Sequence, residues 1–516
     1  MRPSRTRPSR DRGARFPTGL PAVVPVAAPV LVLVVALAAL AACATPGPAP
    51  AAPHPGGAAA DTAPAAAPAV WARAMGGVNR EYANGIAPAA DGGVWVAGHF
   101  TGGTELGGPG GGGALRGAGQ SDAFVARLDR DGGLAWAGRL GGAEADEAKA
   151  VAAAPDGGAY VAGYFSGSAD FDPGPGSAEL TTAGSGDAFL VRLDAGGRLV
   201  WARRFGGRFG DVALGVAADA AGRVYVTGYF QGRARFGEGA EAVERTAAGG
   251  TDAFLAALTP EGELRWTVHF GGPEDDEGRA VAADRDGAVF AGRFGGEAAE
   301  QIGPAGRAPA TARAAGGTDA FAARVGEGGE IGWLARVGGP ADDVAHAVAA
   351  DGAGRAWAAG QFAGDAELGP SANGRVLSSG GRTDGFVVEL GAGGRILETR
   401  SFGSPGDDFP FGLAAAPGGG AYLAGFSQDV PHPDEARGPR PTGSWVVALD
   451  PSLDQRWRRT FDADGGIQVL GLAAPAGEGP RVAGIFEGRA TLDLGPERAE
   501  IVHRRKTDAF AAALAP

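Results

Sequence analysis

The feature that most constrains the fold of this sequence is an internal repeat of 60 to 67 residues. A motif of the form TDAF or SDAF recurs, and its marker positions are Asp122, Asp187, Asp252, Asp319, Asp384, Ser444 and Asp508. A second marker, the glycine of VAGHF and its relatives, gives Gly98, Gly163, Gly228, Gly292, Gly360, Gly425 and Gly484. Because two independent markers agree, the sequence predicts seven copies of one structural unit.

Each unit contains four short strand signals bounded by turn residues. Within residues 201–265 these signals are WARRF, ALGVAAD, RVYVTGYF and the strand that begins with DAF. Turns of the DGG type separate neighbouring strands, and such hairpin turns need residues that tolerate positive φ. The sequence therefore predicts an all-β fold, a seven-bladed β-propeller of four-stranded antiparallel blades.

The two ends of the repeated region indicate how such a ring would close. The last unit stops at TDAFAAALAP without an outermost strand, whereas VWARAMGG, residues 70–77, precedes the first complete inner strand. We expect this N-terminal strand to pair with the strand beginning at Asp508, complete the last blade and remove the open edges of the array. Residues 70–516 would then form a single domain.

Two long segments resemble a known family. GGPADDVAHAVAADGAGRAWAAGQF (338–362) and GYFSGSADFDPGPGSAELTTAGSGDAFLVRLDAGGRLVWARRFGG (163–207) are similar to the bacterial seven-bladed β-propeller repeat family, which is common among exported and surface proteins. The resemblance covers residues 70–516 and implies the fold, but no common catalytic residue. The sequence departs from the pattern where Glu398 replaces an outer-strand Trp, where TGSWVVALD replaces TDAFVARLD, and where FDADGG replaces FGG.

Residues 1–42 have the pattern of a lipoprotein signal peptide. Six arginines within the first sixteen residues precede an uncharged stretch, whose apolar core of thirteen residues is shorter than the roughly 20 that a spanning helix needs. Leu40-Ala41-Ala42-Cys43 resembles the bacterial lipobox, which implies cleavage before Cys43 and acylation of its thiol. A membrane-spanning anchor is the alternative interpretation. Residues 43–69, rich in Ala, Pro and Gly, predict a tether.

This N-terminal pattern predicts an exported protein held at the cell envelope, in the outer membrane, by its acyl anchor. The chain carries a net charge of -13, and residues 1–42 contribute +5, so the remainder carries about -18. Such a balance argues against nucleic acid as a partner. With Cys43 as the only cysteine, the exported part has no disulfide. We expect a monomer without a cofactor.

An acid recurs where each unit enters its innermost strand, and it has two interpretations. The series is Glu81, Asp146, Asp211, Asp276, Asp343 and Asp408, and Ile467 breaks it in the last unit. Six acids around a channel could bind a cation such as Ca²⁺, which takes six to eight oxygen ligands. Alternatively, each carboxylate caps backbone N–H groups of its own turn. Recurrence in every unit favours the turn cap.

Recurring aromatic residues are predicted to pack between sheets, and positions that vary within the repeat are the candidates for a specific function. The position after the marker glycine varies, with candidate ligand-facing residues His99, Tyr164, Tyr229, Arg293 and Gln361, followed by Phe426 and Ile485. An irregular loop, residues 428–443, and the basic run 503–506 are further departures. These residues could equally face solvent and drift.

The sequence contains no pattern of a known catalytic or metal centre. The histidines lack zinc-ligand spacing, and there is no GxSxG motif. These observations favour a non-enzymatic binding or scaffold module for a protein or glycan. The alternative is a propeller-type polysaccharide lyase or hydrolase that uses the carboxylates near the channel as general acid and base.

Overall fold

The computed structural model of the chain describes residues 70–77, 79–107, 112–300, 310–369, 375–428, 441–475, 477–503 and 506–516. All of them belong to the compact unit Val32–Pro516. This unit is all-β, and its only helical element among the described residues is a 3-10 turn, η1 (Gly239–Glu241). Cys43, the predicted signal peptide 1–42 and the predicted tether 43–69 lie outside the described residues.

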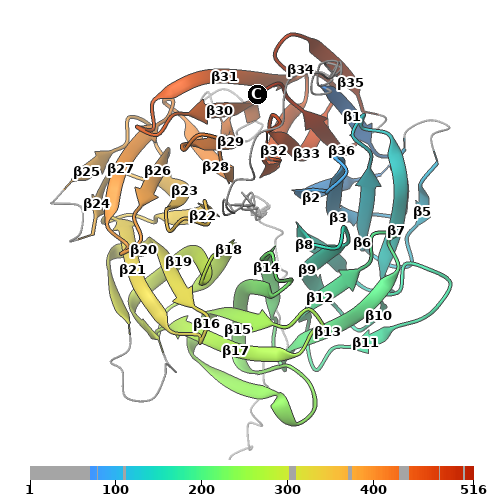
Figure 1. The fold of residues 1–516 in the computed structure, drawn as a ribbon, viewed down its shortest axis with the longest axis horizontal. Helices are drawn as coiled ribbons and strands as arrows, with labels where there is room; N and C mark the ends of the chain where they lie inside the picture. Colours follow the sequence, from blue (N-terminus) through green and yellow to red (C-terminus); the bar gives the residue numbers. More distant parts are fainter. Residues whose placement is uncertain are drawn as a thin grey trace, which may run out of the picture. The chain divides into compact units, whose positions relative to one another are not determined.

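The described strands form seven antiparallel groups of four, which we call repeats 1 to 7 (Figure 1). In each repeat an inner strand pairs with a second strand, the second with a third, and the third with an outer strand. The inner strands are β2 (Glu81–Pro88), β8 (Asp146–Ala153), β14 (Val212–Ala218), β18 (Glu277–Asp284), β22 (Val344–Ala350), β28 (Asp407–Ala415) and β32 (Gly466–Ala473). The second strands are β3 (Val94–Phe100), β9 (Ala159–Phe165), β15 (Val224–Phe236), β19 (Gly287–Glu300), β23 (Ala356–Phe362), β29 (Ala421–Gln428) and β33 (Arg481–Glu487).

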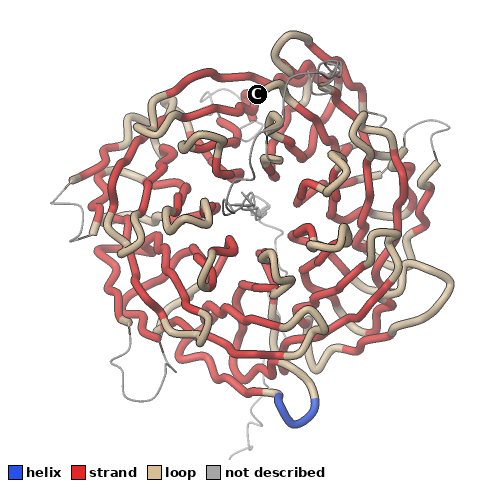
Figure 2. The backbone as a smooth tube through the Cα atoms, in the orientation of Figure 1, coloured by secondary structure: helices blue, strands red, loops and turns tan. Residues whose placement is uncertain are grey.

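The third and outer strands complete each repeat, and strands make up most of the described backbone (Figure 2). The third strands are β6 (Asp122–Leu128), β12 (Asp187–Leu193), β16 (Val243–Leu258), β20 (Thr311–Gly326), β26 (Asp384–Leu390), β30 (Pro441–Leu449) and β36 (Asp508–Ala513). The outer strands are β7 (Leu134–Gly142), β13 (Leu199–Gly207), β17 (Leu264–Gly271), β21 (Ile331–Gly338), β27 (Ile396–Phe402), β31 (Gln455–Ala463) and, in repeat 7, β1 (Trp71–Met75).

The N-terminal strand pairs as the sequence predicts. β1 runs antiparallel to β36, with Trp71 opposite Ala513 and Met75 opposite Ala509. The outer-strand indole of Trp71 also donates a hydrogen bond to the carbonyl of Arg130, in the turn of repeat 1 (2.9 Å). The strand that starts the described chain therefore joins repeat 7 to repeat 1.

The hydrophobic core is divided into layers between successive repeats. Val125 of repeat 1 packs in one cluster with Val161 and Phe189 of repeat 2. Met75 of repeat 7 packs in another with Phe124 of repeat 1. Every residue of β6 and β12 is buried, Arg127 and Arg192 among them, because neighbouring repeats pack on these sheets. The recurring aromatic residues serve this packing, as predicted.

Contacts between the inner strands run in a closed cycle. β2 lies against β8, β8 against β14, and so on through β18, β22, β28 and β32, which lies against β2. Figure 1 shows these strands nearest the centre of the unit. Backbone hydrogen bonds join neighbouring repeats at the same level: the N–H of Asp146 donates to the Ser121 carbonyl (3.0 Å), and that of Glu81 donates to the Thr507 carbonyl (2.9 Å).

The long connections between second and third strands fold outward. They contain the short strands β4 (Gly103–Glu105), β5 (Ala114–Arg116), β10 (Ser168–Asp170), β11 (Glu179–Thr181), β24 (Asp365–Leu368), β25 (Val376–Ser378), β34 (Arg489–Asp493) and β35 (Arg498–Val502). β10, β24 and β34 pair with the outer strands β7, β21 and β31 of the preceding repeats. These hairpins lie at the periphery (Figure 1), so they cover outer edges and not the inner strands.

Candidate binding site at the inner strands

Each inner strand carries a β-bulge at the same position, three residues after the recurring acid position. The pairing register with the second strand shifts there in all seven repeats. The bulge residues are Asn84, Lys149, Leu214, Arg279, His346, Phe411 and Leu470. A bulge re-aims the side chain of its extra residue. Sequence reasoning missed these residues, although their chemical variety at one repeat position was a visible signal.

The structure pairs the predicted ligand-facing residues with residues of the inner strands. The cross-strand pairs are Tyr82 with His99, Glu147 with Tyr164, Val212 with Tyr229, Glu277 with Arg293, Val344 with Gln361, Phe409 with Phe426 and Gln468 with Ile485. We call these residues and the seven bulge residues the central set. All of them lie on the two strands nearest the centre of the unit (Figure 1).

Repeats 1 and 2 contribute a polar cluster. The Lys149 ammonium donates a hydrogen bond to the Glu147 carboxylate (2.6 Å) and lies 5.4 Å from the centre of the Tyr164 ring. The same carboxylate lies 3.6 Å from Nδ1 of His99, on the neighbouring repeat. Burial lowers the pKa of His99 to about 4, so this imidazole is neutral at pH 7. Polar contacts therefore cross the boundary between repeats.

Repeat 4 contributes an excess of positive charge. Oε2 of Glu277 accepts a hydrogen bond from Arg279 and Oε1 accepts one from Arg293, both at 2.5 Å. Burial favours the neutral form of Glu277, but the two guanidinium groups lower its pKa. Two cations therefore share one carboxylate, which leaves a formal charge of +1 on this repeat's part of the central set.

Repeats 5 to 7 change from polar to apolar. Nε2 of His346 lies 2.9 Å from Oε1 of Gln361, and the His346 ring lies 4.7 Å from the ring of Phe411 in repeat 6. Phe411 in turn stacks on Phe426 at 5.4 Å with an interplanar angle of 14°. Leu470 of repeat 7 belongs to the same apolar cluster. The central set is thus charged in repeats 2 and 4, polar in repeat 5 and aromatic in repeat 6.

Five of the six recurring acids hold their turns through hydrogen bonds, namely Asp146, Asp211, Asp276, Asp343 and Asp408. The carboxylate of Asp276 accepts hydrogen bonds from the N–H of Gly272 (2.7 Å) and from the N–H of Gly295 (3.1 Å). Asp343 makes the same pair of bonds with Gly339 (2.8 Å) and Ala363 (3.2 Å). Asp146 and Asp211 follow the same pattern, and Asp408 accepts from backbone and hydroxyl groups. This is the hydrogen bonding expected of turn caps.

A second series of acids, the marker aspartates, lies beside the first. Asp319 accepts hydrogen bonds from the N–H of Ala315 (3.1 Å) and from Arg336 (2.5 Å). Burial, together with Asp319, raises the pKa of Asp343 to about 7. Burial and a neighbouring acid raise the pKa of Asp146 to about 6 and the pKa values of Asp211 and Asp276 to about 7. Within the described part of the chain, no group of three or more His, Cys, Asp or Glu side chains is placed to hold a metal ion.

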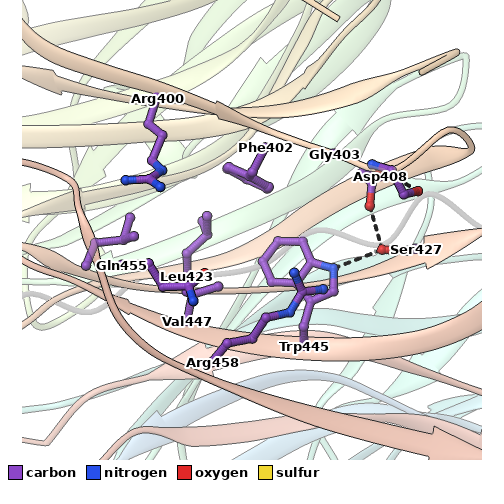
Figure 3. Close-up of a pocket in the computed structure, with 12 residues that line it drawn as sticks. Arg400, Phe402, Gly403, Asp408, Leu423, Ser427, Trp445, Val447, Gln455 and Arg458 are labelled. Atoms are coloured by element: carbon purple, nitrogen blue, oxygen red, sulfur yellow. Dashed lines mark hydrogen bonds between the residues drawn. The ribbon is translucent and has the colours of Figure 1, made fainter. Parts of the chain in front are cut away.

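The departures from the repeat produce a cavity of about 90 Å³ between repeats 5 and 6 (Figure 3). Trp445 lies in its wall and packs edge-on against Phe402 at 5.2 Å. The Trp445 indole donates to the Ser427 hydroxyl (3.2 Å), which donates to the carboxylate of Asp408 (2.5 Å). Arg400 and Arg458 also line the cavity, and the Arg458 guanidinium lies over the Trp445 ring at 5.7 Å. None of the residues that line this cavity belongs to the central set.

Two further candidates lie partly outside the described residues. Of the irregular loop 428–443, residues 429–440 lie outside them. In the basic run 503–506, Nδ1–H of His503 donates a hydrogen bond to the carbonyl of Lys506 (2.8 Å), and residues 504 and 505 lie outside the described residues. Neither segment contributes a described side chain to the central set.

Comparison with known proteins gives one partial similarity. No protein family model matches the chain. A stretch of 109 residues is 28% identical to the regulatory protein FlaEY of Caulobacter vibrioides. This stretch is 21% of the present chain and spans only 11% of the length of that relative. The similarity is too short to show a shared family.

Proposed function

We propose that this protein is a lipid-anchored β-propeller of the cell envelope that binds a protein or glycan at its centre without catalysing a reaction. The proposed fold has seven blades, one for each repeat, closed by β1. The cycle of contacts among the inner strands and the β1–β36 pairing support it. The resemblance of residues 70–516 to the bacterial propeller repeat family supports the same assignment.

A single observation carries the binding function: a repeated framework holds a central set that differs in every repeat. Asp276 and Asp343 make the same two backbone hydrogen bonds in different repeats. The bulge residues beside them, Arg279 and His346, differ in charge and shape. Identical framework with different central residues gives an asymmetric surface, which suits recognition of one particular ligand.

The anchor part of the proposal rests on the sequence. The run Leu40-Ala41-Ala42-Cys43 follows an uncharged apolar stretch, and an acylated Cys43 would hold the protein at a membrane surface. More than one acyl chain is needed for firm attachment, because a single chain binds only marginally. Residues 43–69 would give the bound protein reach from that membrane.

A propeller-type lyase or hydrolase is the second candidate, favoured by the raised carboxyl pKa values. Asp211, Asp276 and Asp343 have pKa values of about 7, which suits a general acid. Their oxygens are already occupied by backbone N–H groups, however. A general acid must reach the substrate, so the binding function has better geometric support.

The experiment compares variants of the central set with variants of the periphery. The soluble chain 43–516 carrying Cys43→Ser would be tested against envelope glycans and envelope proteins by array binding and calorimetry. Tyr164→Ala and Phe426→Ala should each weaken binding at least tenfold, while Arg233→Gln, on an exposed hairpin arm, should not. Binding that survives the central variants but is lost in a peripheral variant would refute a central site. Turnover of any glycan would favour the enzyme.

A further inference from the structure

Several buried polar atoms of the central set have no hydrogen-bond partner among the described residues. They include Nε of Arg279, Nε of Arg293, Nδ1 of His346 and Oδ1 of Asn84. Arg279 is 2% exposed, and Asn84 and His346 are 0% exposed. An unsatisfied buried polar atom destabilises the folded state, and native proteins contain few of them. Three of these atoms, on Arg279, Arg293 and His346, lie on the adjoining repeats 4 and 5, so a single ligand there would satisfy them.

The unpaired guanidinium N–H donors of Arg279 and Arg293 in repeat 4 favour an anionic ligand. Glu277 takes only one hydrogen bond from each of Arg279 and Arg293, whereas a guanidinium has five N–H donors arranged for planar acceptors such as carboxylate. The two arginines also carry one positive charge more than Glu277 compensates. An anionic group is favoured there even though the whole chain carries -13.

The unpaired acceptors on His346 and, in repeat 1, on Asn84 favour hydroxyl or amine donors as their partners. Nδ2 of Asn84 donates to the carbonyl of Ala148 (2.7 Å), which leaves Oδ1 as an acceptor. Nε2 of His346 faces the amide oxygen of Gln361 at 2.9 Å and therefore carries the ring proton, which makes Nδ1 an acceptor. Burial beside Arg279 lowers the pKa of His346 to about 3, so the imidazole stays neutral.

Aromatic rings of repeat 6 lie next to the His346 imidazole of repeat 5. His346 lies 4.7 Å from Phe411, which stacks on Phe426, and Phe409 lies 5.1 Å from Phe426. Aromatic rings at the edge of a polar site provide an apolar platform. A ligand that crosses repeats 4 to 6 would meet guanidinium groups first, then imidazole and amide, then phenyl rings.

We infer that the central set binds an acidic sugar residue, with its carboxylate at Arg279 and Arg293, its hydroxyls at His346 and Gln361, and its C–H face on Phe411 and Phe426. The inference rests on the proposed binding function and names its ligand class. A uronic acid combines one carboxylate, several hydroxyls that both donate and accept, and an apolar face. A peptide C-terminus shares the carboxylate but offers fewer groups that both donate and accept, so we favour the sugar.

The test uses short oligosaccharides of galacturonic, glucuronic, mannuronic and guluronic acid, titrated calorimetrically into the soluble chain 43–516 carrying Cys43→Ser. The fully methyl-esterified form of each is the neutral counterpart, and acetyl-Ala-Ala-Ala-Phe with a free carboxylate is the peptide probe. At least one uronate should bind, and its ester at least tenfold more weakly. Arg293→Gln and Gln361→Ala should each weaken uronate binding at least tenfold, whereas Arg233→Gln should leave it unchanged.

Each outcome decides the inference. Glu277→Gln, which removes the competing carboxylate, should tighten binding of the uronate, a change that a merely structural role would not produce. Equal affinity for acid and ester, or absence of binding by every uronate, would overturn the acidic sugar. Preferential binding of the peptide, lost in Arg293→Gln, would overturn the sugar but leave the proposed central binding site standing. Melting curves of each variant establish that it is folded.

Discussion

The side chains at the start of each inner strand are used mainly to hold the backbone. Asp276 and Asp343 each join the turn before an inner strand to the end of the neighbouring second strand. Where Ile467 interrupts the acid series, Ser444 replaces the marker aspartate of the preceding repeat. The Ser444 hydroxyl donates to the Ile467 carbonyl and accepts from the Val469 N–H, both at 2.9 Å. Two departures that are far apart in sequence therefore compensate one another at a single junction.

The raised pKa of Asp343 predicts a specific pH dependence of stability. Its folded pKa is about 7, above the ordinary value of 3.8, so the folded state binds a proton that the unfolded state has already lost between these pH values. The stability that this group contributes is complete below about pH 4 and falls as pH rises through 7. In urea unfolding, Asp343→Asn should destabilise most near pH 4 to 5 and least near pH 8. A difference that grows with pH would contradict this sign, and Asp131→Asn in an exposed turn is the control.

At the scale of elements, one strand of repeat 6 shows how a shifted aromatic residue is accommodated. The marker motif reads Ser444-Trp445 where five other repeats have Asp-Ala and repeat 5 has Asp-Gly. Trp445 packs against Phe402 of repeat 5, and the Phe402 ring lies over Gly385, where a Cβ would collide with it. Most other repeats have alanine at the position of Gly385. The glycine is therefore required by the Phe402 ring of its own repeat, which packs against Trp445 of the next repeat, and not by its backbone angles.

This packing predicts that replacing Gly385 by alanine, the residue that most other repeats have at this position, destabilises the protein. Gly385→Ala should lower the free energy of unfolding by about 1–3 kcal/mol, because the new methyl group overfills a packed site. Gly393→Ala is the matched control, since a Cβ there meets nothing within 4 Å. Adding Phe402→Leu should recover part of the loss. Equal unfolding midpoints for the two alanine variants in urea would contradict the proposed contact.

The strand β1 predicts a sharp boundary for N-terminal truncation. A chain beginning at residue 70 keeps the pairing of Trp71 through Met75 with β36, whereas a chain beginning at residue 78 loses it. The shorter chain should melt at a lower temperature and aggregate, because β36 becomes an exposed edge. Both chains would carry the same tag and be compared by calorimetry and light scattering. Equal melting and solubility would show that β1 is dispensable.

At the scale of the whole molecule, the apolar core layers and the proposed binding site are separated in space. Apolar layers lie between all neighbouring repeats, including repeats 7 and 1, and these layers consist of residues outside the central set. The peripheral hairpins cover outer edges and leave the central set to differ from repeat to repeat. A site can then change its ligand without a change in the fold.

Attachment to a membrane is the prediction for the complete chain. Cys43→Ser removes the thiol that lipidation needs, so the protein should accumulate unprocessed or leave the detergent phase in a phase-partition assay. Wild-type protein should enter the detergent phase and carry acyl chains by mass spectrometry of its N-terminal peptide. Unchanged partition of Cys43→Ser would point to the spanning anchor in place of the acyl anchor.

Several features were predictable because they depend on short stretches of chain. The spacing of Asp122, Asp187 and their equivalents gave the number of repeats, and alternation of strand and turn signals gave the all-β class. Recurrence of the acids indicated turn caps, since a cap depends on residues within its own unit and the next. The variable position of His99 and Arg293 was also visible, because a repeat provides its own internal comparison.

The sequence by itself determined the repeat, its strands and the pairing expected of residues 70–76. Only the tertiary structure decided that bulges re-aim Arg279, His346 and Phe411, and that the long connections turn outward. A bulge exists only in the register of two paired strands, and the contact between His346 and Phe411 joins different repeats. Such features arise from how repeats meet in space, so the central set could not be assembled from local pattern alone.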